Sequence, residues 1–577
     1  MNKKTVLFLL FVVLVVNFTG IFGTIFTLDS ALYAAISKSF TQSNNYLDIF
    51  VNGKDWLDKP HFPFWICGLS MEVFGINTFA YKLPSYLFFL LGLFYTFKLA
   101  KSLYNQETAY LSVLILGSSL HIVISNNDTR AEAILLGLIM GAVYHMYKLS
   151  QRFSILSILL SAIYCAAAVM TKGVFVLIIM YSAIFLNLFI NKEYKILFDF
   201  RWILLLVATT AFCFPELYAV YQQFDLHPEK VVFGTTGVSG VKFFLWDSQF
   251  GRFFNNGPIQ KSEGDVLFFI HTILWALAPW AIIGLTSLML TTKKIVKNFK
   301  NQEYITYFGF SILFVIFSIS KFQLSHYVNI LFPFIAIMIA QIFITSCDNK
   351  LIQNTIKLSV LLYSFLFVCV IVFINIYFQP ERAWIGWLLL ISIIGIVYFI
   401  LKYSKFNWNF KYLIVGISTS LLFTSFMNLS FYPSLLKYQS GSEMAFYINK
   451  NYSKSNVLIT YYDWAFQFYS KNNCIHINNV DQLKNGDIVV TDYGILENLK
   501  KRNLKYEIIH KTVNFHITGL NFLFLNQSPT TTNGAQNKGC AYAYLFLPLA
   551  SCELKLSIIF TIEACKYSAL FWPCFNC

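Results

Sequence analysis

Apolar runs of about 20 residues recur along this chain from its N-terminus to about residue 430, and they constrain its fold more than any other feature. A run of that length crosses roughly 30 Å of hydrocarbon as an α-helix, because each helical residue adds about 1.5 Å. Asp, Glu, Lys and Arg make up 12% of the 577 residues. Soluble domains contain roughly 25% of these residues. The sequence therefore excludes a water-soluble globule and predicts a polytopic α-helical membrane protein.

Hydropathy predicts about thirteen membrane-spanning helices. The expected spans are residues 6–27, 80–100, 108–126, 131–150, 154–171, 173–191, 202–221, 266–291, 304–320, 327–346, 355–378, 384–401 and 410–428. Lys and Arg gather in every second connection, as the positive-inside rule requires of cytoplasmic loops. Lys3 and Lys4 are therefore expected inside, and the chain after the first span outside. The net charge of +15 then indicates topology rather than nucleic-acid binding.

The first span also resembles a signal peptide. Its apolar run is longer than a typical signal-peptide core, and no A-x-A-like cleavage site follows it. Both observations favour a helix that stays in the membrane.

Composition divides the chain into three expected segments. Residues 1–430 form a transmembrane domain, whose first outer loop (28–76) contains a stretch, Ala31 to Phe40, that predicts an amphipathic helix on the bilayer surface. Residues 431–527 alternate β-rich runs, helix-like pieces and polar turns, which predicts a small outer α/β domain. Residues 528–577 form an atypical apolar tail with five of the eleven Cys residues. We expect an extension without a function of its own, and a weak membrane-associated segment is the alternative.

Ionisable residues next to the membrane are informative, because burying a charge in a bilayer is costly unless the charge is paired or used. On the predicted outer face the candidates are the acids Asp29, Asp128 and Glu132, the cations Lys59, Lys172, Arg252 and Lys321, and the neighbours Tyr33, His61, Arg130, Gln249, His326 and Tyr327. Positive charge is normally depleted from outer loops. These cations therefore indicate an anionic ligand, and a phosphate reached from the membrane is the natural candidate.

Asp128 and Glu132 flank a very short second outer loop. If the next helix begins near Asp128, the two carboxylates lie one turn apart on one face. The structural alternative for Asp128 is a helix N-cap, since Asp is a preferred cap. For the outer Trp residues and cations the alternative is an interfacial belt that anchors helix ends. The lone pair Cys574 and Cys577 has no second pair, so no metal site is predicted there.

With these residues in this order, the sequence resembles the lipid-dependent glycosyltransferases of the GT-C fold, in particular the family of the lipid A aminoarabinose transferase and its protein O-mannosyltransferase relatives. The matching pieces are Asp29, Trp56-Leu-Asp-Lys59-Pro-His61, Tyr81-Lys-Leu-Pro84, Asp128-x-Arg130-x-Glu132, Lys172-Gly173, Pro279-Trp280 and the block from Lys321 to Tyr327.

The resemblance implies a sugar donor carried on a polyprenyl phosphate such as undecaprenyl phosphate. It also implies a cavity at the outer face of a bacterial inner membrane, and transfer with inversion to a lipid, glycan or protein acceptor. Asp29 maps to the reaction centre and Lys59 to the donor phosphate, and Asp128 matches an acid of the second outer loop. Glu132 has no position carried over from the family. No cofactor is evident in the sequence and no metal site is predicted, and the sequence does not identify a divalent-metal requirement.

The expected chemistry agrees with these residue types. An inverting transfer passes through an oxocarbenium-like state and needs a base for a hydroxyl acceptor, which Asp29 or Asp128 would supply. The leaving lipid phosphate keeps its negative charge, so Lys59 with Arg252 or Lys172 would stabilise it.

Two other classes of protein also fit a polytopic chain. A lipid or sugar transporter or flippase would have many helices and cationic pockets, but transporters commonly show internal repeats and polar residues at mid-membrane. The sequence shows neither a repeat nor a mid-span acid. A non-enzymatic anchor for the outer domain would need a single helix and leaves the one-sided charges unexplained.

Overall fold

The computed structural model describes residues 2–548 with gaps, and residues 541–548 are described by their backbone alone. The gaps are residues 261–263, 298–301, 346–348, 454, 461, 473, 478–482, 485, 493–494, 497–505, 516 and 518–540. Cys574 and Cys577 lie outside the described residues.

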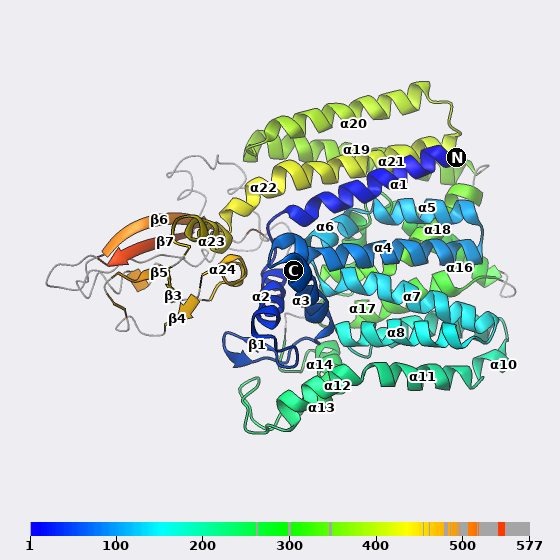
Figure 1. Cartoon of the computed structure of the whole chain (residues 1–577). Coiled ribbons are helices and arrows are strands. Elements are labelled where there is room, and N and C mark those ends of the chain that lie inside the picture. Colours follow the sequence, from blue (N-terminus) through cyan, green and yellow to red (C-terminus); the bar gives the residue numbers. More distant parts are fainter. Residues whose placement is uncertain are drawn as a thin grey trace. The chain divides into compact units, whose positions relative to one another are not determined.

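The chain divides into two units (Figure 1). The membrane unit comprises Met1–Ile21, Ser39–Val368 and Ile391–Thr424. The C-terminal unit comprises Phe22–Lys38, Cys369–Leu390 and Ser425–Cys577.

Long apolar helices run through the membrane unit (Figure 1). Among the described residues, eight spans are long and apolar enough to cross a membrane, or ten if two bent helix pairs are counted. The eight contain α1 (Lys3–Thr19), α4 (Thr78–Leu103), α7 (Ala131–Gln151), α8 (Ile155–Lys172), α18 (Phe332–Thr345), α19 (Lys350–Phe373), α20 (Ala383–Tyr403) and α21 (Trp408–Phe426). The bent pairs are Gln106–Gly117 with Leu120–Asp128 and Tyr194–Phe212 with Phe214–Asp225.

Shorter helices occupy the remaining predicted spans. They are α9 (Val176–Ile190), α15 (Phe268–Ala276), α16 (Ala281–Lys297) and α17 (Ile305–Ile319). Each span predicted from hydropathy thus coincides with a helix or a helix pair. The prediction of a polytopic helical membrane protein is confirmed.

Polar caps and small residues fix the helices in place. The Asn77 side chain accepts the Ala80 N–H at 2.9 Å at the start of α4. Helix α7 packs against both α4 and α8. A Cβ atom at Gly137 of α7 would lie 2.4 Å from the Phe88 carbonyl oxygen of α4, so glycine lets the two backbones approach closely.

The segment between α1 and α4 contains two helices and a hairpin. They are α2 (Leu28–Ser43), β1 (Phe50–Val51), β2 (Lys54–Asp55) and α3 (Phe62–Phe74). Helix α2 covers the stretch predicted as an amphipathic helix. The hairpin turns at Asn52 and Gly53, whose φ angles of 56° and 70° are typical of a type I′ turn.

The turn between α6 (Leu120–Asp128) and α7 differs from the prediction. Asp128 ends α6, Thr129 follows in the left-handed region at φ 42°, and α7 begins at Ala131. The prediction that Asp128 opens or caps the following helix is therefore wrong, and Asp128 and Glu132 do not lie one turn apart on one helix. The polar turn before Asp128 stays helical because it is buried, with the Asn126 amide donating to Asn17 Oδ1 of α1 at 2.8 Å.

The C-terminal unit contains a five-stranded sheet in the order β4-β3-β5-β7-β6. Its strands are β3 (Val457–Ile459), β4 (Cys474–His476), β5 (Ile488–Thr491), β6 (Tyr506–Asn514) and β7 (Ala541–Pro548). Strands β4, β3 and β5 are parallel, and β7 is antiparallel to both β5 and β6. Helices α23 (Ser440–Asn451) and α24 (Trp464–Tyr469) supply Met444, Ile448 and Phe466 to its core. Strand β7 belongs to the segment expected to be a separate tail, and it lies inside the sheet.

Candidate active site

The first charged cluster joins the loop between β2 and α3 to α14 (Ser248–Phe254). Lys59 Nζ donates to Asp58 Oδ2 at 2.8 Å, and the Arg252 guanidinium donates to the other oxygen of the same carboxylate. Arg252 also donates to the Asp58 carbonyl oxygen at 3.0 Å. Burial raises the pKa of Asp58, but the charges of Lys59 and Arg252 outweigh burial and hold that pKa below its ordinary value. Asp58 is therefore the shared anion of two cations.

The second cluster is a chain of alternating charges, built from Asp128, α7, the end of α8 and the 3₁₀ segment η4 (Ser325–Leu331). Lys172 donates to Glu132 Oε1, and His326 Nε2 lies 3.7 Å from Glu132 Oε2. Arg130 joins its neighbours, with NH1 2.8 Å from His326 Nδ1 and Nε donating to Asp128 at 2.6 Å. Asp128, Arg130, Glu132 and His326 are all buried. Tyr327 joins this group, because Lys172 Nζ lies 4.3 Å from its ring centroid.

The two clusters are close enough for their charges to interact. Burial and the positive charge of Arg252 lower the pKa of Lys59, Asp58 opposes them, and Lys172 lowers it further. Gln249 adds a polar side chain here: a Cβ atom at Gly173 would lie 2.1 Å from Gln249 Nε2. The membrane unit thus brings together nine of the predicted site residues: Lys59, Asp128, Arg130, Glu132, Lys172, Gln249, Arg252, His326 and Tyr327.

Three predicted residues lie elsewhere. Lys321 is exposed, and its backbone bonds to Phe253 and Gly264. Asp29 and Tyr33 are one turn apart on α2, in the C-terminal unit, with Asp29 exposed in the first turn.

His61 anchors the segment between α2 and α3 through hydrogen bonds. Its Nδ1 lies 3.0 Å from Glu216 Oε1, its backbone N–H donates to Glu216 Oε2 at 3.0 Å, and its Nε2 lies 3.0 Å from the Leu47 carbonyl oxygen. Glu216 belongs to α12 (Phe214–Val220) and is fully buried. These contacts give His61 a structural role in the segment between α2 and α3.

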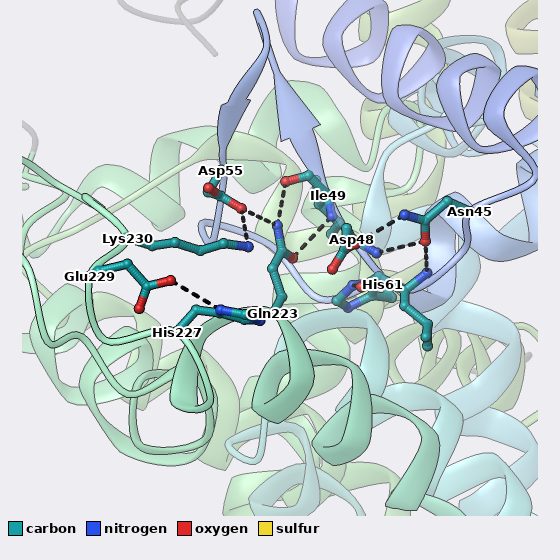
Figure 2. A network of polar contacts seen from close by, with 10 residues as sticks. Asn45, Asp48, Ile49, Asp55, His61, Gln223, His227, Glu229 and Lys230 are labelled. Atoms are coloured by element: carbon teal, nitrogen blue, oxygen red, sulfur yellow. Dashed lines mark hydrogen bonds and ion pairs between the residues drawn. The ribbon is translucent and has the colours of Figure 1, made fainter.

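Figure 2 shows the contacts that hold the β1–β2 hairpin, which precedes His61 in the same segment. Gln223 exchanges two hydrogen bonds with the backbone of Ile49, at 3.0 and 2.9 Å, and donates to Asp55 at 3.0 Å. Lys230 pairs with Asp55 at 2.9 Å. The hairpin that precedes Lys59 is therefore tied to the segment that follows α12.

Several candidate functional residues were not predicted from the sequence. Lys82 of α4 is buried, donates to the Gly20 carbonyl oxygen at 3.3 Å and interacts electrostatically with Asp128. His121 Nδ1 lies 2.7 Å from Asn329 Oδ1. Lys82 and Glu216 lie towards the ends of the predicted spans 80–100 and 202–221, away from mid-membrane. An ionisable residue within a span is the signal that would have found them.

Two buried polar atoms next to these clusters have no hydrogen-bond partner in the part of the chain that the structure describes. They are Thr129 Oγ1 and Asn329 Nδ2. The same part of the chain holds no group of three or more His, Cys, Asp or Glu side chains arranged for a metal ion.

Comparisons with known proteins identify the class to which this architecture belongs. The model of the dolichyl-phosphate-mannose-protein mannosyltransferase family matches residues 58–218. The crystal structure of ArnT from Cupriavidus metallidurans bound to undecaprenyl phosphate superposes with a TM-score of 0.70 at 14% identity, covering 89% of this chain and 97% of that one. The chain is therefore an integral membrane protein with the GT-C glycosyltransferase fold.

Two curated relatives are similar to this chain over about 350 residues. The chain is 23% identical over 351 residues to the undecaprenyl phosphate-alpha-4-amino-4-deoxy-L-arabinose arabinosyl transferase of Wigglesworthia glossinidia brevipalpis, covering 60% of this chain and 59% of that protein. It is 22% identical over 354 residues to a transferase of the same name from Proteus mirabilis, covering 60% of each. The chain thus spans about 60% of the length of these curated relatives. The named relatives are glycosyltransferases, and this similarity favours a glycosyltransferase over a transporter or flippase.

Proposed function

We propose that this protein transfers a sugar from a polyprenyl-phosphate donor to a lipid, glycan or protein acceptor, with inversion, at the outer face of a bacterial inner membrane. The observation that carries the proposal is the shared carboxylate of Asp58, which pairs with both Lys59 and Arg252 while Lys172 lies near enough to disfavour the Lys59 ammonium. A bound phosphate would compensate these like charges. The relatives support such a donor by name, since they use or bind undecaprenyl phosphate.

The leaving group sets the role of the cations. When the glycosidic bond breaks, the lipid phosphate keeps the electron pair, and Lys59, Arg252 and Lys172 stabilise its negative charge. A site whose donors are already in place spends no energy on reorganisation during the reaction.

The carboxylates take different parts. Asp29, exposed in the first turn of α2, serves as the base that takes the proton of a hydroxyl acceptor, or orients a phosphate acceptor. Asp128 accepts from Arg130, and Glu132 lies between Lys172 and His326. These two acids therefore hold the cations and the imidazole in position.

The sugar needs hydrogen-bonding partners of its own. Thr129 Oγ1 and Asn329 Nδ2 are buried and have no partner among the described residues. A buried polar group without a partner costs about 1–3 kcal/mol. Sugar hydroxyl groups would remove that cost, so these atoms are candidates for donor recognition.

The experiment compares the envelope lipids and glycans of cells with and without this protein by mass spectrometry. A sugar lost from one acceptor names the sugar and the acceptor together. Asp29→Asn is expected to abolish that transfer while the protein still folds in detergent. Full transfer by this variant would remove Asp29 from the mechanism, and an unchanged set of lipids and glycans would contradict the proposed function.

A further inference from the structure

Lys38 of α2 is buried in the C-terminal unit and held by three backbone carbonyl groups. Its ammonium donates to the carbonyl oxygens of Gln467, Phe468 and Ser470 at 2.7, 3.1 and 2.6 Å. These carbonyls belong to the last turn and the C-cap of α24. The last carbonyls of a helix lack intrahelical partners and carry partial negative charge, so a lysine is well suited to cap them.

A second contact, from the residues just before α2, reaches α24 on the other side of Asp29. The Ile25 N–H donates to the Tyr469 hydroxyl oxygen at 2.9 Å. Ile25 precedes Asp29 and Lys38 follows it, and both bind the end of α24. The segment that carries the exposed Asp29 carboxylate is therefore fixed at two points to one short stretch of chain, residues 467–470.

That stretch is itself held firmly. Asn449 of α23 donates to the Tyr469 carbonyl oxygen at 2.8 Å and accepts the Lys471 N–H at 2.9 Å. The Phe446 ring packs on the Tyr469 ring with centroids 4.8 Å apart. Asp463 caps the other end of α24 by accepting the Phe466 N–H at 2.7 Å.

We propose that Lys38 is a positioning residue, which makes the C-terminal α/β fold the support that sets the place and orientation of Asp29. The inference rests on the proposed function, in which Asp29 acts on the acceptor. A catalytic group displaced by about 1 Å costs on the order of 100-fold in rate. Loosening either contact with α24 then lowers kcat, whereas the cations that bind the donor phosphate belong to the membrane unit and are untouched.

The test uses the full-length protein in lipid nanodiscs and two independent variants. Lys38→Met removes the ammonium at nearly constant volume, and Tyr469→Phe removes the hydroxyl that accepts from Ile25. We expect Lys38→Met to lower kcat at least about tenfold and Tyr469→Phe about threefold, with the Kd for undecaprenyl phosphate within twofold of the parent, while Lys38→Arg recovers most of the activity. Hydrogen exchange of residues 24–38 should rise in Lys38→Met. Ser43→Ala, at the exposed end of α2, is the matched control and should change nothing.

Each result tests either the positioning role of Lys38 or the proposed function on which that role rests. If Asp29→Asn is inactive while Lys38→Met and Tyr469→Phe keep the parent kcat, the positioning role is overturned and the proposed function stands. If Asp29→Asn is fully active, the proposed role of Asp29 fails first. If undecaprenyl phosphate binding falls in parallel with kcat, the contacts serve general stability and the positioning role is overturned. If Lys38→Met does not fold, a Tyr469→Phe variant with parent kcat and parent exchange overturns it.

Discussion

Lys59 is distinguished from the other outer lysines by its surroundings. It shares the Asp58 carboxylate with Arg252, and burial together with the nearby positive charges lowers its pKa. Lys321 was expected to serve the same phosphate, but it is exposed, and the described contacts of its backbone are to Phe253 and Gly264. The two lysines should therefore respond differently to truncation.

Lys59→Ala should weaken binding of undecaprenyl phosphate by about 10- to 100-fold, because a hydrogen bond to a charged group contributes about 1.5–3 kcal/mol. Lys321→Ala should leave the affinity within about twofold. Titration of each purified variant with undecaprenyl phosphate measures both values. Equal losses of affinity in the two variants would indicate that Lys321 also binds the donor phosphate. An unchanged affinity in Lys59→Ala would contradict a phosphate role for Lys59.

The buried ammonium of Lys38 predicts a pH dependence. Burial lowers the pKa of Lys38 from 10.5 to about 8, and the charge of Cys474, the titratable neighbour in the described contacts, acts in the opposite direction. Above that pH the amine loses a donor, so activity should fall as pH rises through about 8. Lys38→Arg keeps its charge at any such pH, and the ratio of parent to variant kcat should therefore fall over the same range.

Unfolding does not explain such a loss. Between pH 8 and 10.5 the unfolded chain binds the Lys38 proton that the folded chain has released. The contribution of this group to stability therefore rises with pH in that window. A parent-to-variant ratio that stays constant from pH 7 to 9.5 would contradict the prediction.

At the scale of elements, the α6–α7 turn organises the charged clusters. Thr129 is β-branched and lies at φ 42°, a conformation that costs on the order of 1–3 kcal/mol. This turn puts Asp128 at the end of one helix and Arg130 at the N-cap of the next. The Arg130 guanidinium can then bind both Asp128 and His326.

The close approach of α4 and α7 gives an element-scale prediction. Gly137→Ala places a methyl group 2.4 Å from the Phe88 carbonyl oxygen, so the helices must separate, at a cost of about 1–3 kcal/mol. Gly395→Ala of α20 is the matched control, since nothing lies within 4 Å of its added Cβ. Thermal unfolding in detergent should show a lower Tm for Gly137→Ala alone. A Tm unchanged in both variants would contradict the prediction, because it would show that α4 and α7 can separate without loss of stability.

At the scale of the whole molecule, the positive-inside rule predicts an orientation. Glu229 lies in an outer loop by this rule, and Lys294 lies on the cytoplasmic side. Both are exposed. In right-side-out membranes a membrane-impermeant maleimide should label Glu229→Cys and spare Lys294→Cys until the membrane is opened. The reverse pattern would invert the topology and place the proposed site in the cytoplasm.

The helical spans of this molecule could be predicted from its sequence, because long apolar runs cross a bilayer as helices. Each predicted span coincides with a helix or helix pair, and strands β3 and β5 lie within residues 431–527, where β-rich runs were predicted. The site was less predictable. Residue type and predicted side of the membrane selected Lys59, Lys172 and Arg252. Neither indicates that Lys59 and Arg252 share Asp58 while Lys172 pairs with Glu132.

Hydrophobicity and charge act locally along a chain, so the membrane-spanning class, the spans and the residues available for a site follow from the order of residues alone. The tertiary structure decided which of those residues meet. In the folded chain Asp58 pairs with Lys59 and Arg252, and His61 binds Glu216. Helix α6 ends at Asp128. Lys38 binds the end of α24. Such pairings join positions far apart in the chain, and their energies depend on distance and burial, which local pattern does not specify.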